Sequence, residues 1–324
     1  MTEPAPVNDS AVAAADSGLS SAAGRRGAPV DDGAAPTAQA PAAARPAVRF
    51  DSNRAFEDLR RQVAFGPRPA GSAALARCRE YILQQLEAAG IAAREQAFDA
   101  DTPLGRVRMV NLIATIPGPR TDRILISGHY DTKRYREFRF VGANDGGSST
   151  AFLLEMARVL KARRNALTIE LLFLDGEEAS CRDWDECGRP GAPDNTYGSR
   201  RYVRDGKQRG TLAGIRANIL VDMIAGRDPR FKRDLNSTPW LTDLIWAAAR
   251  RMKLDAHFVA QTTAVEDDHI PFMQAGVPSV DIIDLEYRPW HTAGDTLDAV
   301  SARSLQVVGD ALLAALPQLE ARFR

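Results

Sequence analysis

Two short apolar segments constrain the fold of this chain more than any other feature. Residues 168–174 read TIELLFL, and residues 219–223 read ILVDM. A nearly continuous apolar run of this length is typical of a strand that is covered on both faces, as the strands of parallel sheets are. These segments therefore predict an α/β fold whose sheet lies buried between helices.

Segments with strand and helix patterns alternate around these two runs. Strands are expected at 108–116, 123–127 and 279–283, and helices, from the helical spacing of their apolar residues, at 72–89, 148–162, 240–252 and 304–316. Strands that alternate with helices in this way favour a parallel arrangement. We therefore predict one globular domain with a mixed, mostly parallel central sheet that is flanked by helices.

Residues 1–48 differ in composition from the rest of the chain. Ala, Pro, Gly and Ser dominate this segment, and the first aromatic residue is Phe50. Such a segment cannot bury enough apolar surface to offset the entropy of ordering it. We therefore predict a disordered tail at 1–48 and a globular domain at 49–324. The first ten residues, MTEPAPVNDS, lack a positive charge and no apolar core follows, so a signal peptide is not expected.

Charge and cysteine content exclude several classes of protein. The chain has 42 basic and 42 acidic residues and no basic block, which argues against a nucleic-acid-binding protein. It has no apolar run of about 18 residues, so no membrane-spanning helix is expected. Cys78 lies at helical spacing with Leu75 and Ile82 and is expected in the core. Cys181 and Cys187 lie in a polar loop, where they either form a disulfide in an oxidising compartment or stay free.

Polar residues follow the expected strands at the edge where α/β sheets bind their ligands. They are His129, Asp145, the adjacent pair Glu177 and Glu178, Asp222 and His291. Any one of them alone is more often a helix cap or a solvated group. Together, imidazole and carboxylate groups at one edge are typical of a zinc site, in which a catalytic ion keeps one position open. One glutamate of the pair is then free to move a proton.

The ordered motifs GHYD, GANDGGSS, FLDGEEA, YGSR, VDMI and WHTAGDTLD resemble the M28 superfamily of zinc aminopeptidases, from Phe50 to the end of the chain. The resemblance implies an M28-like catalytic domain that binds one or two zinc ions. It also implies that Glu177 is the general base. The residues that match the ligands of the family are His129, Asp145, Glu178, Asp222 and His291.

The segment EDDHIPF at 266–272, together with the later WHT, resembles one branch of this superfamily, the animal-type glutaminyl cyclases. Aminopeptidases of the superfamily usually have a serine-aspartate-histidine segment at this point. In the cyclase branch, the resemblance implies a single zinc on Asp145, Glu178 and His291, and a proton shuttle at Glu177.

The same resemblance implies roles for four further residues. Asp222 and Asp267 would form a carboxylate network near the departing amide, and Trp184 and Trp290 would line the pocket. Glu266 either meets the main chain of the substrate or is solvated. Trp184 stands one residue later than the pattern of the family, in a longer and more polar loop. Elsewhere in EDDHIPF, a helix-capping or ion-pairing role is expected for Asp268 and a structural role for His269.

The activity that the resemblance implies is the conversion of N-terminal glutamine in peptides or proteins to pyroglutamate, with release of ammonia. Two alternatives stay open: an M28-type aminopeptidase, with His129 and Asp222 holding a second zinc if there are two, and a non-catalytic binding module with the same fold. We expect a monomer. The compartment is undetermined, and only the resemblance suggests the cell envelope or secretion. The basic run KRYREFR at 133–139 is interpreted as a solvated loop, with a rim that attracts acidic peptides as the alternative.

Overall fold

The computed structural model describes residues 48–184 and 186–323. The predicted tail at 1–48 therefore lies outside the described residues, apart from Val48. No helix in the described part of the chain is long and apolar enough to cross a membrane.

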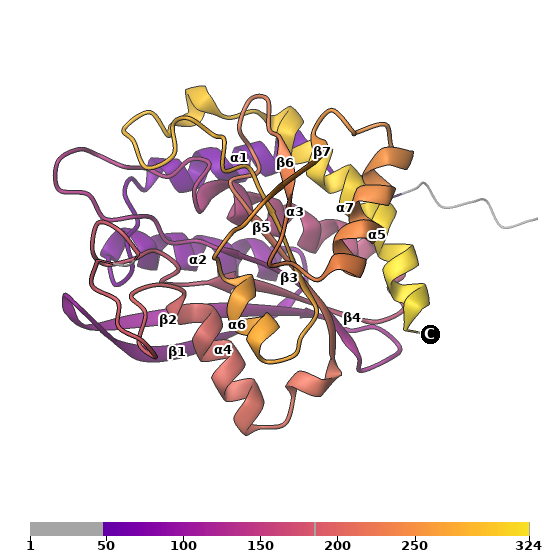
Figure 1. The fold of residues 1–324 in the computed structure, drawn as a ribbon, viewed down its shortest axis with the longest axis horizontal. Coiled ribbons are helices and arrows are strands. Elements are labelled where there is room, and N and C mark those ends of the chain that lie inside the picture. Colours follow the sequence, from indigo (N-terminus) through magenta and orange to yellow (C-terminus); the bar gives the residue numbers. More distant parts are fainter. Residues whose placement is uncertain (1–47, 185, 324) are drawn as a thin grey trace, which may run out of the picture. The chain divides into compact units, whose positions relative to one another are not determined.

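A six-stranded sheet forms the centre of the domain (Figure 1). Its strand order is β1-β2-β4-β3-β5-β8. The parallel part consists of β4 (Thr168–Leu174), β3 (Arg123–His129), β5 (Ile215–Asp222) and β8 (Ser279–Ile283). Antiparallel pairing adds β2 (Gly105–Ile116) and β1 (Ala92–Thr102) at one edge. The prediction of a mixed, mostly parallel sheet is confirmed.

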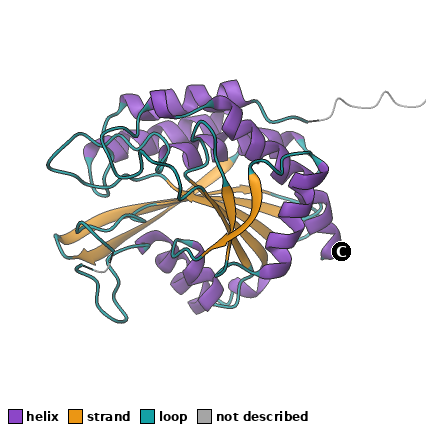
Figure 2. Cartoon of the chain, turned by 45° about the horizontal axis from the view of Figure 1, so that its top comes forward, coloured by secondary structure: helices purple, strands orange, loops and turns teal. Residues whose placement is uncertain are grey.

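Helices cover both faces of the sheet (Figure 2). One face carries α1 (Ser52–Ala64), α2 (Ala73–Ala88), α3 (Gly147–Ala162), α5 (Pro239–Arg251) and α7 (Ala302–Arg322). The other face carries α4 (Tyr197–Gln208) and α6 (His269–Gln274). The short strands β6 (Phe231–Asp234) and β7 (Phe258–Thr263) pair with each other, and two 3-10 turns occupy Leu212–Gly214 and Leu297–Ala299.

The apolar run in β4 shows why the sheet is buried on both sides. Ile169, Leu171 and Phe173 point into the larger core beneath α1, α3 and α7. Leu172 and Leu174 point into the smaller core beneath α4 and α6. Because each fully buried apolar side chain stabilises the fold by about 1.5–3 kcal/mol, this strand anchors both layers.

Two elements that were not predicted, β1 and α4, have polar sequences. In β1, the buried residues are Gln96, Phe98 and Ala100, and four of the six exposed residues of the strand are charged. In α4 (YGSRRYVRDGKQ), Tyr202 and Val203 supply most of the apolar contact. Both segments lack the continuous apolar signal by which the other elements were predicted.

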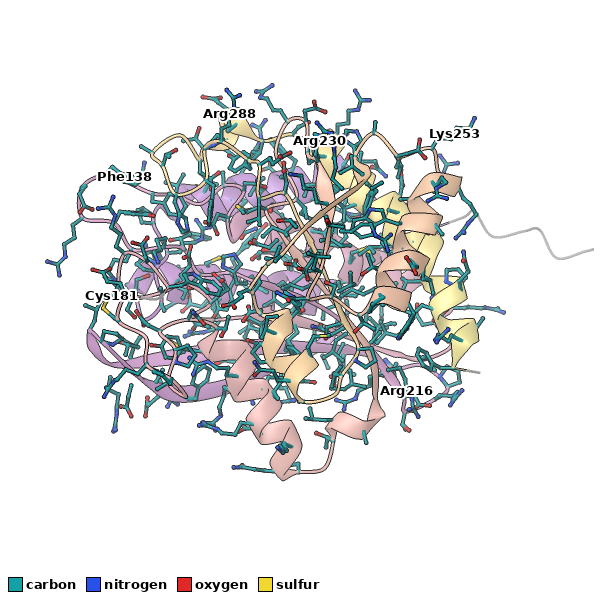
Figure 3. The ribbon with its side chains drawn as sticks, in the orientation of Figure 1. Phe138, Cys181, Arg216, Arg230, Lys253 and Arg288 are labelled. Atoms are coloured by element: carbon teal, nitrogen blue, oxygen red, sulfur yellow. A yellow bond between two sulfur atoms is a disulfide. The ribbon has the colours of Figure 1, made fainter. Side chains whose placement is uncertain are left out.

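The cysteines take two different states. Cys78 is fully buried in the core on α2, as expected. Cys181 and Cys187 form a disulfide in the loop that follows β4. Figure 3 shows Cys181 at the edge of the molecule, on the same side as Phe138.

Candidate active site

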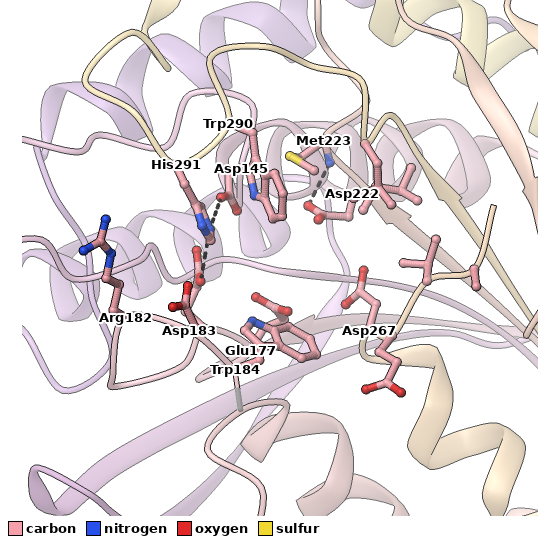
Figure 4. Close-up of a pocket in the computed structure, with 16 residues that line it drawn as sticks. Asp145, Glu177, Arg182, Asp183, Trp184, Asp222, Met223, Asp267, Trp290 and His291 are labelled. Carbon is pink, nitrogen blue, oxygen red and sulfur yellow. Dashed lines mark hydrogen bonds and ion pairs between the residues drawn. The ribbon is translucent and has the colours of Figure 1, made fainter. Parts of the chain in front are cut away.

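A cavity of about 330 Å³ opens where the carboxyl ends of the parallel strands meet. We call it the main cavity. All the predicted site residues line it except His129, which is buried beside it. The residues from the prediction that line the main cavity are Asp145, Glu177, Glu178, Trp184, Asp222, Glu266, Asp267, Trp290 and His291. Figure 4 shows His291 with Asp145 on one side of the main cavity and Asp267 on the other.

Asp145, Glu178 and His291 form a compact group at one end of the main cavity, with ligand atoms all within 4.8 Å of one another. His291 Nε2 lies 3.4 Å from Asp145 Oδ2 and 3.6 Å from Glu178 Oε2. Ligands at about 2.0 Å from a tetrahedral zinc ion are themselves separated by about 3.3 Å. Asp145 Oδ2 and Glu178 Oε1 are buried and accept no hydrogen bond. The donor set, the spacing and these unsatisfied oxygens therefore fit a divalent cation.

The backbone at His291 takes a conformation that is uncommon for this residue type. Its φ is +55°, in the left-handed region, which costs on the order of 1–3 kcal/mol and is often found at functional sites. Trp290 lies against the imidazole ring, with centroids 4.5 Å apart, and Phe140 meets it edge-on at 6.0 Å. Burial opposes protonation of the ring, but Asp145 and Glu178 raise the pKa of His291 to about 10. The two carboxylates thus attract positive charge to this point.

The loop before α3 holds Asp145 by contacts on its backbone. Asp295 accepts hydrogen bonds from the backbone N–H groups of Asn144, at 2.8 Å, and Asp145, at 3.1 Å. Tyr287 donates its hydroxyl to the same Asp295 carboxylate at 2.7 Å. Gly146 has φ +79°, and a Cβ there would lie 2.2 Å from the backbone oxygen of Asp131, so only glycine fits.

A second group of possible ligands adjoins the first. His129, Asp145 and Asp222 also bring their ligand atoms within 4.8 Å. His129 Nε2 lies 3.1 Å from Asp222 Oδ1 and 3.2 Å from Asp145 Oδ1. Burial opposes a charge on His129, but Asp222, with Asp131 and Asp145, raises its pKa well above the usual range. In this arrangement the imidazole of His129 hydrogen-bonds Asp222 and lies at ion-pair distance from Asp145.

Glu177 contributes a carboxylate that belongs to neither ligand group. Its backbone N–H, like that of Glu178, donates to the carboxylate of Asp131, at 3.2 and 3.4 Å. This double hydrogen bond orients the two glutamates in the loop after β4. Burial raises the pKa of Glu177 well above its usual range, and the negative charges of Glu178 and Asp267 raise it further. Such a group retains protons more strongly than an exposed glutamate.

Asp267 of the EDDHIPF segment faces the main cavity from the side opposite to His291 (Figure 4). Its Oδ2 atom is buried without a hydrogen-bond partner. Burial, followed by the charge of Asp222, raises the pKa of Asp267 well above its usual range. A carboxyl group in this state is suited to hydrogen-bonding a polar ligand atom in the main cavity.

The next two residues of EDDHIPF face away from the main cavity. Asp268 stands at the N-cap of α6 but forms no capping hydrogen bond, so the expected capping role is wrong. It accepts a hydrogen bond from the Ser199 hydroxyl instead, because α4 packs directly against α6. His269 is fully buried with its Nε2 3.1 Å from Asp234 Oδ2, which matches a structural role.

Lys133, Asp131 and Asp295 support the site but were not predicted as site residues. Lys133 is only 1% exposed, and its ammonium donates to the Ala179 carbonyl at 3.0 Å and lies 3.7 Å from Glu178 Oε2. The interpretation of KRYREFR as a solvated loop is therefore wrong for Lys133, which is buried in the loop that follows β3. The spacing of Asp131 and Lys133 at two and four residues after His129 was the available signal.

Comparisons with known proteins agree with this geometry. A sequence profile of peptidase family M28 matches residues 111–316. The glutaminyl-peptide cyclotransferase of Drosophila melanogaster is 30% identical over 262 residues, which cover 72% of each chain.

Solved structures with the same fold include two kinds of enzyme. A glutaminyl cyclase from an Acidobacteriales bacterium has 39% identity and a TM-score of 0.80, over 88% of this chain and 99% of that one. A leucine aminopeptidase precursor from Bacteroides thetaiotaomicron has 26% identity and a TM-score of 0.77, over 83% of this chain and 98% of that one. The relatives of this chain include glutaminyl-peptide cyclotransferases. The chain therefore belongs to peptidase family M28.

Proposed function

We propose that this chain is a zinc-dependent glutaminyl cyclase, which acts as a monomer on peptides or proteins with N-terminal glutamine. It would close the glutamine side chain onto its own α-amine to form pyroglutamate and release ammonia. The observation that carries the proposal is the position of Asp267. It faces the same main cavity as the group Asp145, Glu178 and His291, from the opposite side. The cyclotransferase relatives support the proposal.

Asp145, Glu178 and His291 would hold one zinc ion. When bound, this ion would supply Lewis acidity toward the γ-amide carbonyl of the substrate. Two carboxylates and one imidazole leave a coordination position open, as catalytic zinc sites do. Lys133 would keep Glu178 in place through its contact at 3.7 Å.

Glu177 would move the proton. The α-nitrogen forms a bond to the γ-carbonyl carbon, the bond from that carbon to the amide nitrogen breaks, and one proton passes from the α-amine to the departing ammonia. Glu177 is a buried carboxylate outside the ligand groups, and its loop is oriented by Asp131. Because the attack is intramolecular, the site mainly needs to position the chain and transfer this proton.

The remaining residues would hold the substrate. Asp267, with Asp222 beside it, would accept or donate hydrogen bonds at the amide nitrogen that leaves. Trp184 and Trp290 supply aromatic faces to the main cavity and would exclude water from the glutamine side chain. Glu266 stands at the same cavity and would meet the substrate's main chain.

A specific observation favours a second candidate function, hydrolysis of the first peptide bond. The group His129, Asp145 and Asp222 has a spacing that suits a second metal ion. A leucine aminopeptidase precursor shares the fold. We rank this function second because His129 already hydrogen-bonds Asp222 and lies 3.2 Å from Asp145 Oδ1.

Mass spectrometry distinguishes these functions. Zinc-loaded protein is incubated with a Gln-initiated and a Leu-initiated peptide of otherwise equal sequence. The proposal predicts loss of one ammonia from the Gln peptide alone, without shortening. A peptide that loses its first residue would instead establish an aminopeptidase.

A Glu177→Gln variant tests the proton shuttle. It should lower kcat by about 10²–10⁴-fold, the usual range for a general acid–base residue. The matched control is Glu137→Gln, in the exposed loop before Asp145, which should retain full activity. Glu177→Gln with near-normal turnover would refute the assignment.

A further inference from the structure

A second cavity of about 420 Å³, which we call the side cavity, adjoins the main cavity. Trp184, Glu266 and Asp267 line both, so these three residues form the wall between them. The far wall of the side cavity comes from the segment 188–196 and from α6, including Ile270 and Pro271. The proposed function leaves this cavity without a role.

The wall of the side cavity is built by a folded segment of the chain. The disulfide between Cys181 and Cys187 closes the turn that carries Trp184. Arg189 and Ala192 pair by two backbone hydrogen bonds of 3.1 and 2.8 Å. Beyond this turn, Asp194 accepts from the backbone N–H of Cys181 at 2.9 Å. The side cavity is thus bounded by a cross-linked segment.

Charge distinguishes the two cavities. The main cavity is lined by many carboxylates and suits the positive N-terminal amine of a peptide. The side cavity is lined by Arg189 and Arg200, together with Glu266 and Asp267 of the shared wall. Arg200 donates to the carbonyls of Pro193 and Asn195 and lies over the Tyr197 ring, so it is held in place. Neither arginine forms an ion pair with a carboxylate among the described residues.

We propose that the side cavity is a subsite for an acidic side chain at the second or third position of the substrate. This inference rests on the proposed function, which places the N-terminal glutamine in the main cavity. An extended peptide advances about 3.5 Å per residue, so the residues after glutamine reach the shared wall of Trp184 and Glu266 next. A carboxylate that passes this wall meets Arg189 and Arg200. Peptides that begin Gln-Glu or Gln-X-Glu are therefore preferred over the lysine equivalents.

The test compares four peptides, Gln-Glu-Ala-Ala, Gln-Ala-Glu-Ala, Gln-Lys-Ala-Ala and Gln-Ala-Lys-Ala, by kcat/KM at low salt. At the preferred position, kcat/KM for the glutamate peptide should exceed that for the lysine peptide by about three- to tenfold. The arginines attract the glutamate and repel the lysine, and the two effects add. The ratio should fall toward one at high salt. The pair of peptides that shows the larger ratio identifies the position.

An Arg189→Glu variant should abolish or reverse this ratio. The matched control is Arg209→Glu at the exposed end of α4, which lies outside both cavities and should keep the wild-type ratio. Ratios near one in the wild type, or an unchanged ratio in Arg189→Glu, would overturn the subsite. Failure of the proposed function gives a different result from failure of the subsite, because none of the four peptides would then release ammonia. Calorimetric binding of the same peptides to the Glu177→Gln protein measures the preference without turnover.

Discussion

Replacement of Arg68 by methionine tests how the loop that carries Asp145 is held. Arg68 is fully buried, and its guanidinium donates to the carbonyls of Gln62, Gly66, Val141 and Gly142, at 3.3, 3.1, 2.9 and 3.2 Å. The last two acceptors precede Asp145 by only three and four residues. Arg68 therefore connects the end of α1 to the loop that leads into the metal-ligand group.

The magnitude follows from what the substitution leaves behind. Gln62 O also accepts from a backbone N–H, but the other three buried carbonyls have Arg68 as their hydrogen-bond donor. Each buried carbonyl without a donor costs about 1–3 kcal/mol, partly offset because no charge is buried any longer. We expect the free energy of unfolding to fall by about 3–5 kcal/mol, and Tm to fall by on the order of 10 °C.

Thermal unfolding followed by circular dichroism, with zinc in excess, is the assay. Arg68→Lys should give an intermediate loss, because one ammonium reaches fewer carbonyls. Arg136→Met, in the exposed loop nearby, should change stability by no more than about 0.5 kcal/mol. Arg68→Met with an unchanged Tm would refute the reasoning that these carbonyls depend on the guanidinium.

Three further predictions follow from the site. Removal of the proposed zinc ion by a chelator should abolish turnover and lower Tm, because Asp145 and Glu178 then repel each other. Added zinc should reverse both effects, and a chelated protein that keeps full activity would exclude the metal. The double variant Cys181→Ser and Cys187→Ser should raise KM several-fold with little change in kcat, because the turn that carries Trp184 loosens; steady-state kinetics with an unchanged KM would contradict this. Tyr287→Phe removes the hydrogen bond to Asp295 and should lower the free energy of unfolding, measured with urea, by about 1 kcal/mol. A change near zero would show that Asp295 does not depend on this hydrogen bond.

Much of the fold could be predicted because apolar patterns are local properties of the sequence. The run TIELLFL indicated a strand covered on both faces, and Ile169 and Leu172 do enter opposite cores. The elements β1 and α4 were not predicted because they lack such a local apolar pattern. Their burial comes from a few side chains that contact distant elements, as Phe98 does, and the segments have no apolar period of their own.

For the site, the sequence alone determined which residue types stand at the ends of strands. Asp145, Glu178 and His291 were therefore predictable at one edge, where the carboxyl ends of parallel strands meet, whereas their selection as one ligand set came from the resemblance to the cyclases. Lys133 was not predictable, because a basic residue in a basic run is normally solvated, and only the contact between its loop and the loop at Ala179 buries its ammonium.

Only the tertiary structure decided how segments far apart in the sequence combine around the main cavity. Asp295 lies 150 residues after Asp145 yet accepts its backbone N–H. The disulfide of Cys181 and Cys187 was one of two open possibilities in the sequence, and it now bounds a second cavity. Local patterns determine secondary structure and residue chemistry, whereas distances between side chains depend on how the elements pack. That packing places the candidate ligands and Glu177 at one cavity and the proposed subsite at the cavity beside it.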